Sequence, residues 1–271
     1  MRMFFSLAPL ALVVGCGSPA QDSRQQPDGV KDTATQESVT AAAPSVQQDR
    51  GSAESGGVPL PIGHLVVEIA GVRRECMVSF LGGGRVLTAG HCLAAGAPAQ
   101  VGARTACPAG AAIGWLVRRG ERLSVGPKRS SCQSVVNFFD GSEDSSDLAV
   151  IALGEPLEGS FPVVTWKVFA AVAINPLVSL VGPDRNKEGD SFNARRGYAF
   201  SVTGHLFDHN AEQAPGLSGA PVVLRAENEW LPATYQAVGI HLGRSMGTNR
   251  ALRSERILSF LEQYERLEGV L

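Results

Sequence analysis

The stretch SDLAVIAL at residues 146–153 places an acidic residue, Asp147, directly before six consecutive apolar positions. A short apolar run of this length is typical of a strand that is buried on both faces. Similar runs recur along the chain, separated by turns rich in Gly and Pro, at residues 65–69, 76–80, 85–89, 177–181, 219–224 and 237–240. Many short strands divided by such turns predict an all-β sandwich or barrel.

One helix is predicted near the C-terminus, where Ser254 can cap a segment with apolar residues at helical spacing. These residues are Ile257, Leu258, Leu261, Tyr264 and Leu267. They would form one apolar face with which the helix packs onto the strands.

Composition argues against several classes of protein. The 271 residues include 24 Lys and Arg against 26 Asp and Glu, for a net charge of −2, so there is no basic surplus with which to bind nucleic acid. The 31 Gly and 16 Pro favour strands and turns over helices. The apolar run near the N-terminus is too short to span a bilayer, which argues against a polytopic membrane protein.

The N-terminal residues 1–16 read MRMFFSLAPLALVVGC, with Arg2 before an apolar core. This pattern predicts an export signal over residues 1–15. Its end resembles the lipobox of bacterial lipoproteins. This resemblance implies that Cys16 is lipidated and anchors the protein to the cell envelope. By the same resemblance, Gly17 after the lipidated cysteine is compatible with sorting to the outer membrane. A plain signal peptide with a chance cysteine is the alternative.

Residues 16–58 are rich in Gln, Ser, Ala, Asp, Thr and Pro and contain no aromatic side chain, which predicts a disordered tether. Residues 59–271 are then one folded domain. With Cys16 assigned to lipid, four of the five cysteines remain, and three disulfide pairings are possible. A zinc site is the alternative use of these cysteines, but they show no CxxC spacing.

Three segments carry residues suited to nucleophilic catalysis. TAGHC at residues 88–92 places His91 after small residues, SDLAV places Asp147 before a strand, and PGLSGAP at residues 215–221 places Ser218 on a Gly-rich turn. Such a turn can expose a hydroxyl and direct N–H groups at one spot. Each segment alone also fits a structural histidine, an ordinary turn aspartate or a passive serine. The serine motif is not GxSxG, because Ala220 replaces the last glycine.

In the chain order His, Asp, Ser, the segments TAGHC, DLAVIAL and GLSGAPV resemble the signature segments of the trypsin-like (chymotrypsin-fold) serine proteases. The resemblance implies two six-stranded antiparallel β-barrels with a C-terminal α-helix. It also implies an endopeptidase with Ser218 as nucleophile, His91 as base and Asp147 as its carboxylate partner, acting through an acyl-enzyme. Asp140 and Asp144 are competitors for the carboxylate role.

The same resemblance implies an oxyanion hole made by the backbone N–H groups of Gly216 and Ser218. It implies a disulfide between Cys76 and Cys92, with Cys107–Cys132 as the second pair. Closing the 16-residue loop of the first pair is worth about 3 kcal/mol. Leu217 stands where animal trypsins carry the aspartate that pairs with a newly cut N-terminus, so we expect activity without such a cut.

Residues 237–243, AVGIHLG, followed by NRA at residues 249–251, resemble the V8-like, glutamyl-endopeptidase group of the family. That resemblance implies that His241 lies in the pocket for the P1 side chain and favours Glu or Asp there. Gln213 stands where glutamyl-specific members tend to carry Thr or Ser. Glu212 occupies the position whose acidic residue gives trypsin its preference for Lys and Arg, so the two signals conflict.

His205, Asp208 and His209 could bind a metal if they lay on one helix. Gly204 and Asn210 favour a loop instead. We therefore expect no metal, and we expect no other cofactor. The expected partners are a protein or peptide substrate and a membrane, bound through the N-terminal lipid, with the protein itself a monomer. A catalytically silent, protease-like binding module on the cell surface is the alternative function. A purely structural lipoprotein would explain neither the ordered triad nor the cysteine spacing.

Overall fold

The computed structural model describes residues 57–94, 101–141, 145–157, 161–171, 175–184, 191–227, 229, 234–245 and 247–269. The predicted signal, Cys16 and residues 16–56 of the predicted tether lie outside these ranges. The first strand begins at Val58, one residue before the predicted start of the domain. Across the described residues, no helix has both the length and the apolar character needed to cross a membrane.

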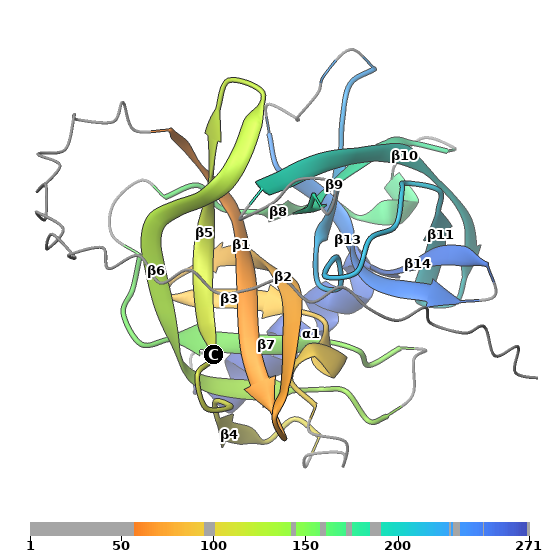
Figure 1. Cartoon of the computed structure of the whole chain (residues 1–271). Helices are drawn as coiled ribbons and strands as arrows, with labels where there is room; N and C mark the ends of the chain where they lie inside the picture. Colours follow the sequence, from red (N-terminus) through yellow and green to blue (C-terminus); the bar gives the residue numbers. More distant parts are fainter. Residues whose placement is uncertain are drawn as a thin grey trace, which may run out of the picture. The chain divides into compact units, whose positions relative to one another are not determined.

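The first half of the described chain forms a closed antiparallel barrel of six strands (Figure 1). Around the barrel the order is β5, β1, β2, β3, β7, β6, and pairing of β6 with β7 closes it. The strands are β1 (Val58–Ile69), β2 (Val72–Gly82), β3 (Arg85–Thr88), β5 (Ala112–Arg119), β6 (Arg122–Asn137) and β7 (Ala149–Leu153). The short β4 (Arg104–Ala106) pairs with the end of β6.

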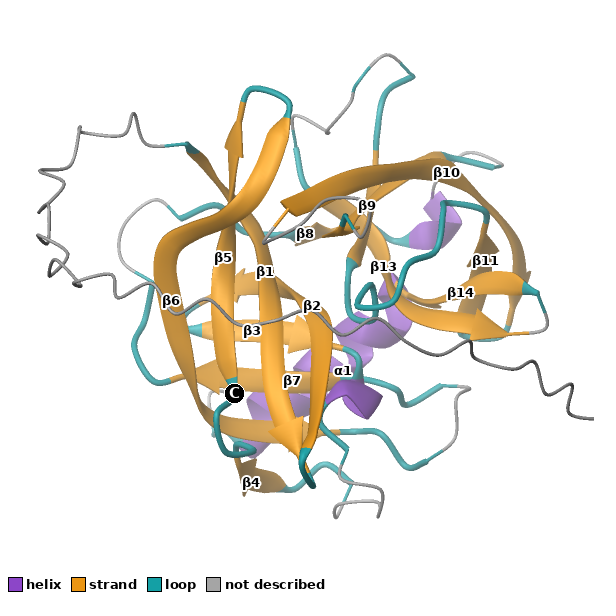
Figure 2. Cartoon of the chain, in the orientation of Figure 1, coloured by secondary structure: helices purple, strands orange, loops and turns teal. Residues whose placement is uncertain are grey.

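The second half forms another closed antiparallel barrel of six described strands (Figure 2). Its order is β10, β9, β12, β13, β14, β11, and pairing of β10 with β11 closes it. The strands are β9 (Leu177–Pro183), β10 (Ser191–Thr203), β11 (Leu206–His209), β12 (Pro221–Leu224), β13 (Gln236–Ser245) and β14 (Thr248–Arg253), and β8 (Thr165–Trp166) pairs in parallel with β13. The β6–β10 pairing joins the two barrels, so the predicted pair of six-stranded barrels is confirmed.

Each barrel has its own apolar interior, and the apolar run of residues 148–153 contributes to two cores. On β7, Ala149 and Ile151 pack inside the first barrel. Leu148 and Val150 point to the opposite face, where they pack with the C-terminal helix. A strand that is covered on both faces needs apolar residues at every position, which explains why this segment shows no alternation.

The C-terminal helix α1 (Ser254–Leu267) packs through Ile257, Phe260 and Tyr264 against Leu87 of β3 and its neighbours. Its predicted cap is wrong, because Arg253 is the residue that precedes the helix and no side chain caps it. Ser254 is fully buried instead, and its hydroxyl donates to the Lys167 carbonyl at 2.7 Å and accepts from the Phe169 N–H at 3.1 Å. Leu267 is 55% exposed, so it does not belong to the buried face as predicted.

Candidate active site

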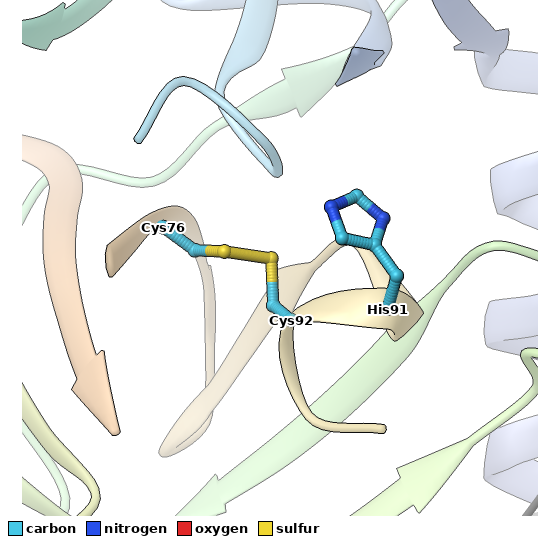
Figure 3. A group of neighbouring side chains, drawn as sticks. All are labelled: Cys76, His91 and Cys92. Carbon is cyan, nitrogen blue, oxygen red and sulfur yellow. A yellow bond between two sulfur atoms is a disulfide. The ribbon is translucent and has the colours of Figure 1, made fainter. Parts of the chain in front are cut away.

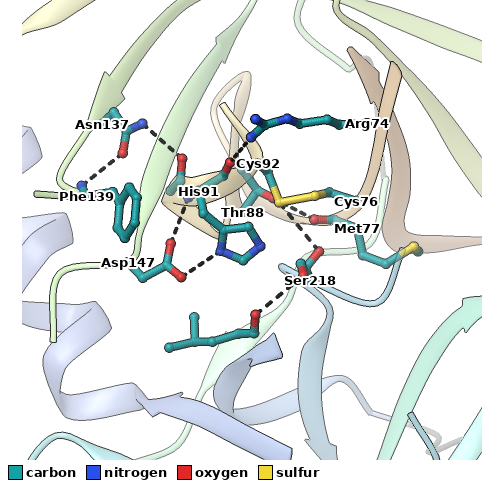
Figure 4. Close-up of polar contacts among 12 residues, drawn as sticks. Arg74, Cys76, Met77, Thr88, His91, Cys92, Asn137, Phe139, Asp147 and Ser218 are labelled. Carbon is teal, nitrogen blue, oxygen red and sulfur yellow. Dashed lines mark hydrogen bonds and ion pairs between the residues drawn. A yellow bond between two sulfur atoms is a disulfide. The ribbon is translucent and has the colours of Figure 1, made fainter. Parts of the chain in front are cut away.

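The pairing of β3 with β7 brings His91 and Asp147 together. Thr88 pairs with Ala149, so the residues that follow β3 lie beside those that precede β7. His91 sits in the short 3₁₀ turn Gly90–Cys92, with its Nδ1 2.7 Å from Asp147 Oδ2 (Figure 4). The His91 backbone N–H donates to the other carboxylate oxygen, Oδ1, at 2.8 Å. One carboxylate therefore fixes both the ring and the backbone of the histidine.

The side chain of Asp147 is buried, whereas that of His91 is accessible to a substrate. The Asp147 side chain is 4% exposed, whereas that of His91 is 35% exposed. The tautomer of His91 that donates from Nδ1 to this carboxylate leaves Nε2 to accept a proton. Asp140, one of the two competitors, is exposed, and Asp144 lies outside the described residues.

Asn137 and Arg74 hold the backbone around His91. Asn137 Nδ2 donates to the Gly90 carbonyl at 3.0 Å, and Arg74 Nη1 donates to the His91 carbonyl at 2.8 Å. A Cβ at Gly90 would lie 2.5 Å from Phe139 Cβ and 2.7 Å from Asn137 Oδ1. Only glycine therefore fits at this point of the TAGHC segment.

A disulfide between Cys76 and Cys92 joins β2 to the residue that follows His91 (Figure 3). A second disulfide joins Cys107 and Cys132, so both pairs are those that the resemblance implies. In the described part of the chain, Cys76, Cys92 and His91 are also the one group whose ligand atoms lie close enough to share a metal ion. Because the two sulfurs are bonded to each other, they cannot serve as thiolate ligands.

Ser218 lies on a tight turn just before β12, and this turn contacts the first barrel. The Met77 N–H on β2 donates to the Ser218 carbonyl at 2.8 Å, while the Met77 carbonyl accepts from Thr88 Oγ1 at 2.8 Å. A Cβ at Gly219 would lie 2.3 Å from the Met77 oxygen and 2.4 Å from Thr88 Oγ1. The glycine thus lets the serine turn pack directly on the strands that position His91.

The N–H groups of Gly216 and Ser218 donate no hydrogen bond to any described residue, whereas those of Leu217, Gly219 and Ala220 all do. Gly216 has a φ of +88°, which favours glycine. Two unpaired N–H groups on one turn can bind an oxyanion. The Ser218 hydroxyl donates to the Leu242 carbonyl at 3.4 Å, and His91 is not its partner among the described residues.

Of the three residues predicted to determine the P1 preference, one is buried and two are exposed. His241 is 1% exposed, and its Nδ1 lies 3.0 Å from Nε2 of the equally buried His209. Burial lowers the pKa of His209 to about 4 and that of His241 to about 3, so both rings are neutral at physiological pH. Glu212 and Gln213 are exposed.

The segment with His205, Asp208 and His209 is not a loop as predicted, because residues 206–209 form β11. Consecutive side chains of a strand point to opposite faces. Accordingly, His209 packs inward on His241, while Asp208 Oδ1 faces Arg250 Nε at 3.7 Å. These side chains do not converge on a common ligand.

A pocket of about 340 Å³ opens beside His91 and Asp147, and sequence reasoning assigned no role to the residues of β13 and β14 that line it. These are Leu242, Gly243, Arg244 and Arg250. Arg244 directly follows the AVGIHLG segment, so that segment was a usable signal for it. Arg250 belongs to residues 249–251, NRA, which carry the same resemblance, but only the pairing of β14 with Gly243 brings it to the pocket.

Comparison with known proteins supports the fold only. No family model matches the chain, and no curated protein does. Among solved structures, HL collagenase is similar with a TM-score of 0.57 at 12% identity, over 79% of this chain and 97% of that one. The protease Rv3671c of M. tuberculosis H37Rv, as an inactive Ser343Ala mutant, gives a TM-score of 0.48 at 15% identity, over 75% and 87% of the two chains.

The likeness to HL collagenase agrees with the two closed six-stranded barrels and the C-terminal helix of the described chain. The chain has the chymotrypsin-like all-β fold.

Proposed function

We propose that this protein is an exported, lipid-anchored serine endopeptidase that uses His91, Asp147 and Ser218. The observation that carries the proposal is the pair of short bonds from His91 to the buried carboxylate of Asp147. A half-exposed histidine held by a buried carboxylate, beside a serine on a glycine turn, is the arrangement that acyl transfer requires.

In the proposed reaction, Ser218 Oγ attacks the carbonyl carbon of the scissile bond while Nε2 of His91 takes the hydroxyl proton. Asp147 keeps the proton on Nδ1 and stabilises the imidazolium that forms. The N–H groups of Gly216 and Ser218 bind the developing oxyanion. His91 then gives its proton to the leaving amine, and water releases the acyl group from Ser218 by the same steps.

The hydroxyl of Ser218 must turn from the Leu242 carbonyl toward His91 for this reaction. Its bond to that carbonyl is long, at 3.4 Å, and rotation about one side-chain torsion is fast. Catalytic hydrogen bonds are often long before substrate binds. A silent binding module could keep the same resting geometry, so turnover is the property that separates the two functions.

Activity should not require cleavage near the start of the domain. Leu217 is 1% exposed and belongs to the apolar core of the second barrel. Gly182 makes room for it, since a Cβ there would lie 2.2 Å from Leu217 Cδ2. A buried leucine cannot form an ion pair with a new N-terminus, which favours a domain that is competent as synthesised.

For the P1 residue we propose Glu or Asp, bound with help from His241. The neutral ring of His241 would act as a hydrogen-bond donor to the substrate carboxylate and would add no positive charge. The exposed Glu212 favours Lys or Arg at the same site, so a peptide library with all residues at P1 decides between them. Cleavage after Lys or Arg alone would contradict the role of His241.

Export agrees with the two disulfides, which form and persist in oxidising compartments. Lipid attachment at Cys16 is tested by fractionation. We expect the wild type in the membrane fraction and Cys16→Ala in the soluble extracytoplasmic fraction. Equal distribution of the two would argue for a plain signal peptide.

Turnover of a denatured protein substrate tests the enzymatic part of the proposal. Ser218→Ala should abolish cleavage, while Ser131→Ala, an exposed serine on β6, should leave it unchanged. Cleavage retained by Ser218→Ala would overturn the assignment. A wild-type protein that is folded yet cleaves nothing would favour the binding module.

A further inference from the structure

The pocket beside His91 is lined by residues other than those of the serine turn. Its lining includes His91 and Phe139 from the first barrel and Leu242 and Arg244 from β13. None of its described lining residues belongs to the stretch 212–218, where the resemblance places the P1 site. It is therefore a second place for a substrate side chain at the same catalytic centre.

The charge available in this pocket is positive. Arg244 is exposed, and no carboxylate in the described part of the chain pairs with it. Arg250 adds a second guanidinium, whose Nε lies 3.7 Å from Asp208 Oδ1. The carboxylate of Asp147 is almost fully buried and already accepts two bonds from His91, so it offers little to a ligand.

The edge of β13 shows how a substrate would reach the pocket. Pairing of β13 with β12 stops at Ile240, and beyond His241 the described strands cover only its β14 side. An extended peptide can add to such an open edge. No atom lies within 4 Å of the position that a Cβ would take at Gly243, so the chain has room to pass there.

The position of Leu242 sets the register of that peptide. Its carbonyl lies 3.4 Å from Ser218 Oγ, so the substrate residue whose carbonyl is attacked, P1, lies next to it. Neighbouring side chains of an extended chain point to opposite sides. If the P1 side chain points toward residues 212–216, the side chain of P2 points toward His91 and its pocket.

We propose that this pocket binds an acidic side chain at P2, and that Arg244, assisted by the charge of Arg250, determines the preference. The inference rests on the proposed endopeptidase function and narrows its substrate class to peptides with Asp or Glu at P2. The planar guanidinium of arginine matches a carboxylate with two parallel hydrogen bonds, so Arg244 is suited to read this group.

Matched peptides with one fixed P1 residue, chosen from the P1 library, test the proposal. They carry Glu, Gln or Lys at P2, and the quantity compared is kcat/KM. We expect the wild type to prefer Glu over Gln by about 10-fold. Arg244→Gln should bring this ratio close to one, and Arg244→Glu should favour Lys over Glu. Because Arg244 is exposed, the wild-type ratio should also fall as salt is raised.

Arg122→Gln is the matched control, because Arg122 is an exposed arginine at the start of β6 and does not line the pocket. It should keep the wild-type ratio. A wild-type ratio near one, or a ratio that survives in Arg244→Gln, would overturn the inference. If Arg244→Gln instead removed an acidic preference at P1, the assignment to P2 would be wrong. Absence of all cleavage would count against the endopeptidase function itself.

Discussion

Replacing Gly219 with alanine should separate the serine turn from the strands that hold His91. The new Cβ would lie 2.3 Å from the Met77 carbonyl oxygen, 2.4 Å from Thr88 Oγ1 and 3.0 Å from the Ala89 nitrogen. Two of these atoms, the Met77 oxygen on β2 and the nitrogen of Ala89 directly after β3, belong to the backbone, so they cannot move aside cheaply. Gly219 also has a φ of +82°, where any other residue is strained.

The expected loss of stability follows from these two effects. The left-handed backbone costs about 1–2 kcal/mol for alanine. Forcing a methyl group into packed surroundings costs about 1–3 kcal/mol more. We therefore expect the free energy of unfolding, measured with urea, to fall by about 2–5 kcal/mol. If the turn moves by about 1 Å, turnover at Ser218 should also fall about 100-fold.

Gly110→Ala is the matched control for this experiment. Gly110 has a similar φ of +71°, but no atom lies within 4 Å of the position its Cβ would take. It should lose only the backbone term of about 1–2 kcal/mol and keep full turnover. If the two variants lost equal stability and both kept turnover, the contact between the serine turn and β2 would be refuted.

Three further predictions concern the site and its surroundings. Asp147→Asn should lower kcat by about 10⁴-fold with the fold intact, because the amide no longer holds the proton on His91 Nδ1; a loss below 10-fold in steady-state kinetics would contradict the triad. Replacing Cys76 and Cys92 together with serine should cost about 3 kcal/mol in urea unfolding and slow turnover, whereas the same change at Cys107 and Cys132 should cost similar stability and leave turnover unchanged. Burial lowers the pKa of His209 to about 4 and of His241 to about 3, from the ordinary value of 6.5. As the pH falls below 6.5, both rings therefore bind protons in the unfolded chain while they stay neutral in the folded chain. Stability should then drop between pH 6.5 and 4 by up to about 1.4 kcal/mol per pH unit for each histidine, and His209→Gln should flatten that slope.

The sequence predicts the strands that are apolar on both faces, because a continuous run such as residues 148–153 leaves little choice of structure. It misses β10, where buried and exposed positions alternate and one buried position is Arg195. That arginine is 7% exposed, and the bond from its Nη2 to the Pro183 carbonyl at 2.8 Å offsets part of the cost of burying its charge. A bond to a backbone carbonyl of a neighbouring strand has no signature in the sequence.

The helix shows how tertiary contacts override a local signal. Serine before an apolar periodic segment predicts a cap, and α1 does begin at Ser254. The hydroxyl bonds to the Lys167 carbonyl instead, which ties the helix to a segment 87 residues away. Local propensity cannot anticipate a partner that only folding supplies.

The candidate site was predictable as far as its motifs extend. His91 and Asp147 are 56 residues apart, and the structure brings them together through the pairing of β3 with β7. The hydrogen bonds by which Asn137 holds the backbone before His91 and Met77 holds the serine turn could not be predicted, since neither residue belongs to one of the three motifs. Arg244 and Arg250 become partners in one pocket only when β13 pairs with β14.

The proposal that Ser218 is the nucleophile is tested most directly by a fluorophosphonate probe followed by peptide mapping. Such a probe reacts with a serine only when a neighbouring base activates it. We expect one adduct per chain, located on Ser218, and none in Ser218→Ala or His91→Ala. Folded wild-type protein that takes up no probe, or that carries the adduct on another residue, would contradict the account.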